Sequence, residues 1–154
     1  MIRCVIVEDE EMARNVLKSL LAQYCKDVMV CAEADDVVSG KTIIEAYRPD
    51  LVFLDIEMPG GSGFKLLNSI GNINFETIFI TAYEQFAIKA IRHDALDYLL
   101  KPVDPKELVA AVEKVKETKL KKSLERQYDN ILKNLNPDQL VVRKISLSTS
   151  DKIH

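Results

Sequence analysis

Short runs of apolar residues alternate along this chain with longer segments in which apolar residues recur every three or four positions. The short runs are rich in β-branched and aromatic residues and predict strands at 2–7, 28–34, 51–54, 77–80 and 98–100. The helical spacing predicts helices over 11–24, 37–47, 64–70 and 85–92, and a longer helix from Pro105. One face of the first helix is expected to carry Met12, Val16, Leu20 and Leu21.

Strands that alternate with helices in this way predict an α/β fold with a parallel sheet covered by helices on both faces. The continuously apolar strands agree, because a parallel strand is buried on both sides. We therefore predict a doubly wound, five-stranded parallel sheet with the flavodoxin-like strand order 2-1-3-4-5.

The pattern changes after residue 118, where the first domain (1–118) is expected to end. Residues 119–138 are highly charged but keep a helical stripe, which comprises Leu120, Leu124, Tyr128, Ile131 and Leu135. We interpret them as a helical linker that extends the last helix or follows it, and we favour a solvated amphipathic helix over a coiled coil. Residues 139–154 alternate like one strand and a turn, which is not a stable unit alone, so they predict the start of a second, truncated domain.

Polar side chains follow four of the five predicted strands. Glu8 and Asp9 follow the first strand, Asp55 the third, Thr81 the fourth and Lys101 the fifth. The carboxyl ends of parallel strands share one edge of the sheet, and the first and third strands are neighbours in the predicted order. We therefore expect the three acids to converge, with Thr81 and Lys101 approaching from the other side.

Three carboxylates at close range repel one another and require positive charge nearby. Lys101 supplies one charge, and a hard divalent cation held by oxygen ligands, Mg²⁺ or Mn²⁺, supplies two more. A carboxylate, a metal, an ammonium group and a hydroxyl are the parts of a phosphoryl-transfer site. In that interpretation Asp55 is the nucleophile, Lys101 stabilises the transferring phosphoryl group and Thr81 donates a hydrogen bond to it.

These motifs resemble the response-regulator receiver domains of bacterial two-component signalling. The resemblance rests on "VIVEDE", "LVFLDIEMPGGSG", "FITAY" and "DYLLKP", in that order, and covers residues 1–118. It implies that Asp55 accepts a phosphoryl group from a sensor histidine kinase, and that Tyr98 is an aromatic switch residue acting with Thr81. It also implies a cis peptide before Pro102. The chain would then be a phosphorylation-controlled regulator and not a turnover enzyme.

The resemblance also implies which groups hold the metal ion. They are the carboxylates of Glu8, Asp9 and Asp55 and the backbone carbonyl of Glu57. Glu8 stands where Asp is commoner, and its longer side chain leaves contact through water as an alternative to direct ligation. For Glu57 the side chain is expected to be incidental.

The segments "TAYEQFAIKAIRHDALDYLLKP" and "KISLSTSDKIH" are similar to LytTR-type response regulators (the LytR/AlgR-like group), whose second domain binds DNA. This resemblance implies transcription regulation, with DNA bound only through the missing part of that domain. As a separate hypothesis, we expect a homodimer on phosphorylation, through the face formed by 85–92, 98–100 and the helix from Pro105. Small and apolar groups on that face are expected at Ala87, Ile88, Ala90, Ile91 and Ala95.

Alternatives remain at several positions. Thr81 also suits the N-cap of a helix that starts near Glu84, and His93 is expected to be a solvated residue at a helix end. A phosphatase of the haloacid-dehalogenase type would need Asp-x-Asp, whereas the chain has Asp55-Ile56-Glu57. A flavin binder would need a phosphate-accepting loop where Glu8 and Asp9 stand. A pseudo-receiver that only binds partners is the remaining alternative.

The composition restricts the partners and the cellular compartment that we expect. The net charge of −3 gives no bulk signature of nucleic-acid binding. The 3 cysteines form no close-spaced pair, which predicts reduced thiols in the cytoplasm. No apolar run approaches the roughly 20 residues that a membrane span needs, so no membrane association is expected.

Overall fold

The structure is a computed structural model that describes residues 1–135. The chain divides into two compact units, Met1–Lys116 and a second from Glu117 onward, and helix α5 (Pro105–Lys133) contains the boundary between them. The first unit holds the sheet and every predicted site residue. The described part of the second unit consists almost entirely of the last turns of α5.

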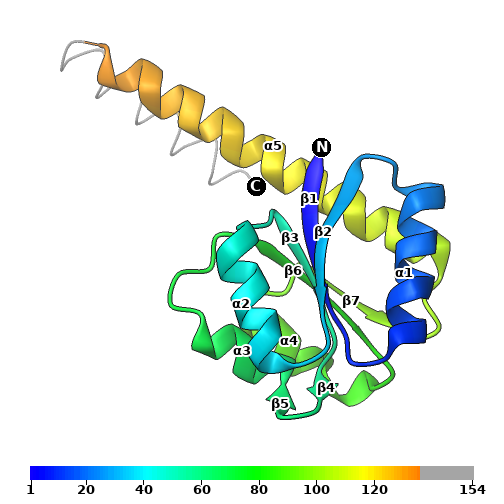
Figure 1. Ribbon diagram of the computed structural model, residues 1–154. Helices are drawn as coiled ribbons and strands as arrows, with labels where there is room; N and C mark the ends of the chain where they lie inside the picture. The colour runs from blue at the N-terminus through cyan, green and yellow to red at the C-terminus, as the bar shows by residue number, and fades with distance from the viewer. Residues whose placement is uncertain (136–154) are drawn as a thin grey trace. The chain divides into compact units, whose positions relative to one another are not determined.

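One parallel sheet organises the first unit, with the strand order β2-β1-β3-β6-β7 (Figure 1). Its strands, in chain order, are β1 (Ile2–Val7), β2 (Val28–Ala34), β3 (Leu51–Leu54), β6 (Glu76–Thr81) and β7 (Asp97–Leu100). This order confirms the predicted 2-1-3-4-5 arrangement. Val7 is opposite Leu54, which is in turn opposite Phe79, so the three central strands reach the same edge of the sheet in register.

Alternating side chains of the strands build two apolar cores, one on each face of the sheet. Helices α1 (Glu11–Tyr24) and the first part of α5 cover one face, where Leu17 and Leu108 pack against Ile6 and Phe53. The other face is covered by α2 (Val37–Tyr47), α3 (Gly63–Ser69) and α4 (Ala87–Arg92) (Figure 1). This is the doubly wound architecture predicted from the strand pattern.

The apolar face predicted for the first helix is only partly buried. Met12 and Val16 are 79% and 54% exposed, whereas Leu17 and Leu21 are buried against the sheet. Periodicity defines an apolar stripe on a helix, but packing decides which edge of that stripe faces the core. Two apolar side chains of α1 therefore remain at the surface near the carboxyl edge of the sheet.

The region after β3 contains elements that the sequence pattern did not predict. Strands β4 (Glu57–Met58) and β5 (Gly61–Ser62) form a small antiparallel hairpin, and two-residue strands carry no readable periodicity. The helix predicted at 85–92 is instead a 3₁₀ turn, η1 (Glu84–Phe86), followed by the six-residue α4. The third helix begins one residue early, at Gly63, because the Ser62 side chain caps it.

Helix α5 continues without a break to Lys133, as the stripe of apolar residues predicts for a helical extension of the fifth helix. Its Leu120, Leu124 and Ile131 side chains are exposed. The division into domains at residues 118 and 138 stays a prediction, and the second domain predicted at 139–154 lies outside the described residues. Among the described residues, no helix combines the length and apolarity that crossing a membrane requires.

Candidate functional site

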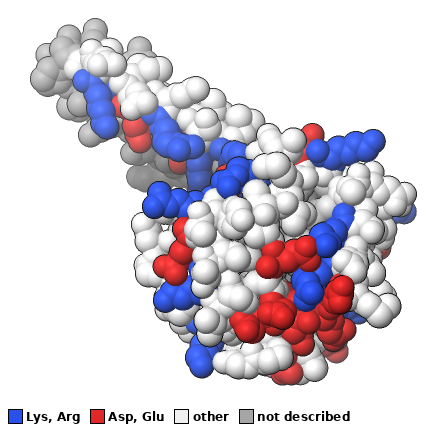
Figure 2. All heavy atoms as spheres, in the orientation of Figure 1, with Lys and Arg blue, Asp and Glu red and all other residues white. Residues whose placement is uncertain are grey.

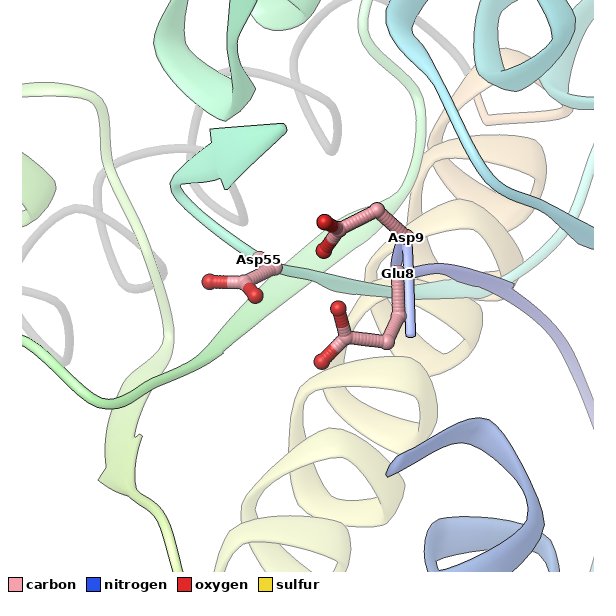
Figure 3. A group of neighbouring side chains, drawn as sticks. All are labelled: Glu8, Asp9 and Asp55. Carbon is pink, nitrogen blue, oxygen red and sulfur yellow. The ribbon is translucent and has the colours of Figure 1, made fainter. Parts of the chain in front are cut away.

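Three acids from two neighbouring strands meet at the carboxyl edge of the sheet, as the sequence predicts. Glu8 and Asp9 follow β1, Asp55 follows β3, and one oxygen of each lies within 4.8 Å of the others. Figure 3 shows the three carboxylates directed into the same space. The set consists only of carboxylate oxygens, the ligands that a hard divalent cation prefers.

Asp55 is held in place by short contacts on each side. Its backbone N–H donates to the Val7 carbonyl oxygen at 3.0 Å. Its Oδ1 accepts a hydrogen bond from the Ile56 N–H at 2.7 Å, and its Oδ2 lies 3.0 Å from Lys101 Nζ. The residue is only 6% exposed, but it lines a cleft of about 310 Å³ that also contains Glu57 and Tyr83. The carboxylate is therefore oriented and reachable from one side.

Lys101 brings its ammonium group between two of the acids. Nζ pairs with Glu8 Oε1 as well as with Asp55. Its backbone N–H donates to the Thr81 carbonyl oxygen at 2.8 Å, which ties β7 to β6 at this edge. Burial alone would lower the pKa of Lys101, but hydrogen bonds to the two carboxylates outweigh it and raise the pKa. The peptide between Lys101 and Pro102 is cis, as the resemblance implies.

Of the two metal-ligand candidates that follow β1, Glu8 is buried and Asp9 is partly buried. Burial, reinforced by the neighbouring Asp9 side chain, raises the pKa of Glu8 to about 8, although Lys101 opposes the shift. Burial is the main cause of the Glu8 shift, whereas hydrogen bonds to two carboxylates raise the pKa of Lys101. The three acids together carry more negative charge than the single Lys101 ammonium group neutralises, so the site favours a further cation.

Thr81 and Tyr98 lie beside this cluster, on β6 and β7. Thr81 is fully buried, and its Oγ1 accepts a hydrogen bond from the Tyr83 N–H at 3.3 Å. The cap position of the following 3₁₀ turn is Tyr83, so the alternative of Thr81 as a helix N-cap is wrong. Tyr98 is partly buried, its hydroxyl donates to the Tyr83 carbonyl oxygen, and burial raises its pKa.

The loop after Asp55 is shaped by a close approach of backbone segments. A Cβ on Gly63 would lie 2.4 Å from the Asp55 carbonyl oxygen, so α3 begins directly against the phosphoacceptor candidate. Gly60 adopts a φ of 84°, which favours glycine. Glu57 is exposed, and the negative charge of its carboxylate raises the pKa of the nearby Tyr83 hydroxyl.

Arg14 is a positioning residue that the motif analysis missed. Its guanidinium donates to the carbonyl oxygens of Glu8 at 2.8 Å and Asp9 at 3.3 Å, and it also pairs with Glu33. These contacts hold the β1–α1 loop, and with it two of the three acids. The sequence held one clue to this role: Arg14 stands one helical turn after Glu10, within the first turns of α1, where a long side chain can reach back to the β1–α1 loop.

The surface agrees with this local picture. Figure 2 shows acidic side chains gathered at the lower right of the first unit, over the edge where the carboxyl ends of the strands lie in Figure 1. The face is therefore suited to a cation, because fields from clustered charges add.

Comparisons with known proteins agree with this fold and site. The family model described as "Response regulator receiver domain" matches residues 4–113. A parallel sheet of this order with an acidic pocket at its carboxyl edge is the receiver class of fold. The chain belongs to the response regulator receiver family, which serves two-component systems.

Individual relatives and structures support the assignment. The chain is 39% identical to "Sensory transduction protein LytT" of Bacillus cereus over 121 residues, which cover 77% of this chain and 49% of that protein. It is 34% identical over 128 residues to "Transcriptional regulatory protein BtsR" of Escherichia coli, covering 80% and 52%. The REC domain of AraT, a response regulator from Geobacillus stearothermophilus, superposes with a TM-score of 0.70 at 31% identity, covering 79% of this chain and 98% of that one. The chain spans about half the length of the curated relatives it matches.

Proposed function

We propose that this chain is a phosphorylation-controlled switch whose phosphoacceptor is Asp55. The observation that carries the proposal is the position of the Asp55 carboxylate, between two further acids and the Lys101 ammonium group at the mouth of a cleft. A sensor histidine kinase is the proposed phosphodonor, in keeping with membership of the receiver family.

Mg²⁺, or Mn²⁺ in its place, is the proposed cofactor. The carboxylates of Glu8, Asp9 and Asp55 fit a hard divalent cation, and the backbone carbonyl of Glu57, in the same cleft as Asp9 and Asp55, is the proposed fourth ligand. Such an ion, when bound, neutralises negative charge on the transferring phosphoryl group. The protein supplies the geometry, because Arg14 and the β1–β3 pairing hold the acids before any ion arrives.

The chemical step uses groups that the fold already orients. An oxygen of Asp55 attacks the phosphorus atom, and the new O–P bond forms as the bond between phosphorus and the donor nitrogen breaks. The electron pair of that bond returns to the donor. Lys101 moves from its carboxylate partners to the phosphoryl oxygens, where its charge stabilises the transition state. Thr81 donates its hydroxyl to the attached phosphoryl group.

A partner that delivers the phosphoryl group must cover the surface beside Asp55. An apolar cavity of about 230 Å³ lies between α1 and the segment after β7, and it is lined by Val16 and Val103 and bordered by Asp55 and Lys101. Met12 is 79% exposed on the same helix. Apolar groups concentrated at the rim of a polar site are typical of a protein contact surface, so we assign this face to the kinase.

The output is proposed to be a change in the face formed by α4, β7 and α5. A phosphoryl group adds about −1.5 to −2 charges at one point. It draws Thr81 inward, and Tyr98 then leaves its hydrogen bond with Tyr83 and fills the released space. Ile88 and Ile91 are 69% and 71% exposed on this face and suit a second copy of the chain, whereas Ala90 is buried and belongs to the core, contrary to prediction.

In the whole protein the switch is proposed to control transcription through a LytTR-type DNA-binding domain. The support is the similarity to proteins named LytT and to the transcriptional regulatory protein BtsR. Residues 139–154 would begin that domain. The phosphorylated receiver would dimerise and thereby place two such domains on one DNA site.

Intact mass after incubation with a small phosphodonor tests the site. Wild-type protein with Mg²⁺ is expected to gain one adduct of about 80 Da, the mass of the transferred HPO₃ group. Asp55→Asn, which keeps the shape of the side chain, is expected to gain none, and neither is wild-type protein in EDTA. An adduct that survives Asp55→Asn, or an unmodified wild-type chain, would refute Asp55 as the phosphoacceptor.

Two further measurements separate the alternatives. Sustained hydrolysis of a generic phosphate ester would favour a phosphatase over a switch. Light scattering with and without a phosphoryl mimic tests dimerisation, and Ile88→Asp together with Ile91→Asp should keep the protein monomeric. A wild-type protein that stays monomeric at high concentration with the mimic bound would refute the dimer.

A further inference from the structure

The first residues of α3 connect the phosphoacceptor segment with α4 through one buried ring. Gly63 donates its N–H to the Ile56 carbonyl oxygen at 2.7 Å and packs without a side chain against the Asp55 backbone. Phe64 is the next residue and is 2% exposed. The position of its ring therefore depends directly on the backbone at Asp55 and Ile56.

The Phe64 ring contacts three different elements on the side of the sheet that carries α4. Its centroid lies 5.0 Å from that of Phe79 on β6 and 6.3 Å from that of Phe86 on η1. The His93 ring, at the end of α4, lies 4.9 Å away, and Lys89 Nζ of the same helix lies 4.7 Å from the centroid. These separations are those of favourable aromatic and cation–π pairs. Figure 1 shows α3 and α4 side by side, as these contacts require.

Helix α4 makes few other buried contacts that fix its position. It is six residues long, and only Ala90 of it is buried. A helix this short is not stable through its own hydrogen bonds and depends on tertiary contacts. His93 also closes the end of the helix, since its Nδ1 lies 3.0 Å from the Lys89 carbonyl oxygen. His93 lies at the end of α4, as predicted, is partly exposed, and also packs its ring against Phe64.

We propose that Phe64 is a positioning residue that couples the phosphoacceptor segment to α4 through its contacts with Lys89 and His93. The second route to the same ring is Tyr98, whose centroid lies 6.2 Å from that of Phe79. A displacement of the Asp55 backbone is transmitted to Phe64 through Gly63, and a movement of Tyr98 is transmitted to it through Phe79. The signalling part of this inference rests on the proposed function, whereas the mechanical tie between α3 and α4 does not.

Hydrogen exchange of the unmodified protein tests the mechanical tie. Phe64→Leu is compared with Phe75→Leu, a buried phenylalanine of the same core that has no such contacts with α4. Loss of the ring contacts predicts amide exchange in α4 that is roughly fivefold faster than in the Phe75→Leu protein. Equal protection of α4 in the two variants would overturn the proposal.

A second pair of variants isolates the lysine. Lys89→Met keeps the aliphatic stem and removes the charge over the ring, and Lys26→Met is the control at an exposed site with no partner on α4. Lys89→Met should speed exchange in α4 roughly two- to fivefold, and this effect should vanish in the Phe64→Leu background. An effect that persists there would place Lys89 in contact with something other than Phe64, against the proposal.

Methyl NMR of Ile88 and Ile91 with Mg²⁺ and beryllofluoride, a phosphoryl mimic, tests the signalling part. In Phe64→Leu the mimic should still bind, but the shift changes of the two methyl groups should fall below half of those in Phe75→Leu. Full-sized changes in Phe64→Leu would refute the coupling. A wild-type protein that does not respond to the mimic would refute the proposed function instead, and the exchange comparison would then decide the tie between α3 and α4.

Discussion

The substitution Gly63→Ala tests how closely the start of α3 packs against the backbone of Asp55. The added Cβ would lie 2.4 Å from the Asp55 carbonyl oxygen and 3.0 Å from Leu54 Cγ. An ordinary carbon–oxygen contact is near 3.4 Å, so α3 and the end of β3 must separate by about 1 Å. The closer group is backbone and cannot move aside as the end of a flexible side chain could.

The expected cost follows from two opposing terms. Forcing a methyl group into a packed region costs about 1–3 kcal/mol. Replacing glycine by alanine in a helix returns about 0.4–1 kcal/mol, since the unfolded chain loses freedom. Gly63→Ala should therefore lower the free energy of unfolding by about 1–2 kcal/mol, and the melting temperature by about 4 °C for each kcal/mol. Phosphorylation should slow as well, because Asp55 and its Lys101 contact are displaced.

Two other glycines provide matched controls. A Cβ on Gly71 meets nothing within 4 Å, so Gly71→Ala should be neutral or stabilising by about 0.4–1 kcal/mol. Gly60 also has open space, but its φ of +84° makes alanine unfavourable by about 1–2 kcal/mol. Urea unfolding followed by circular dichroism ranks the three variants, and intact mass measures the rate at which the adduct forms. A Gly63→Ala protein as stable as Gly71→Ala, with an unchanged phosphorylation rate, would refute the close-approach argument.

Three further predictions follow from titrating groups. Burial raises the pKa of the Cys4 thiol to about 12, so iodoacetamide near pH 8 should label Cys31 first and leave Cys4 unreacted in mass spectra of the native protein. The Asp36 carboxylate caps α2 by accepting hydrogen bonds from the Ser39 hydroxyl and N–H, and these bonds lower the pKa of Asp36. Asp36→Ala should therefore lower the melting temperature at neutral pH. The difference from wild type should disappear as the pH falls below the ordinary pKa range of Asp. Because the native state raises the pKa of Glu8 from 4.5 to about 8, wild-type stability should fall as pH rises through that window, and urea midpoints of Glu8→Gln without divalent cations should fall less.

Much of the site could be predicted because parallel sheets place equivalent strand ends together. Asp55, Lys101 and the acids after β1 lie far apart in sequence, yet strand pattern and topology suffice to bring them to one edge. The chemistry of those side chains then restricts the function.

The errors fall where tertiary contacts decide the outcome. Met12 belongs to an apolar stripe, but the sheet meets the other edge of that stripe. Ala90 was placed among the apolar surface groups of α4, yet it is buried in the core beneath that helix. The β4–β5 hairpin is too short for any pattern to show it. In each case the deciding neighbour is distant in sequence, so a local pattern does not report it.

The groups around Asp55 differ from one side to the other. Toward β1 and α3 it is bounded by backbone: the Val7 carbonyl, the Ile56 N–H and Gly63, all in short contact with it or with its next neighbour. Toward β6 and α4 the neighbours are a 3₁₀ turn, a short exposed helix and a half-buried tyrosine. Segments with few buried contacts open at the lowest free-energy cost. We therefore expect a charge added at Asp55 to be accommodated by movement on the β6–α4 side, where Ile88 and Ile91 are exposed at the surface.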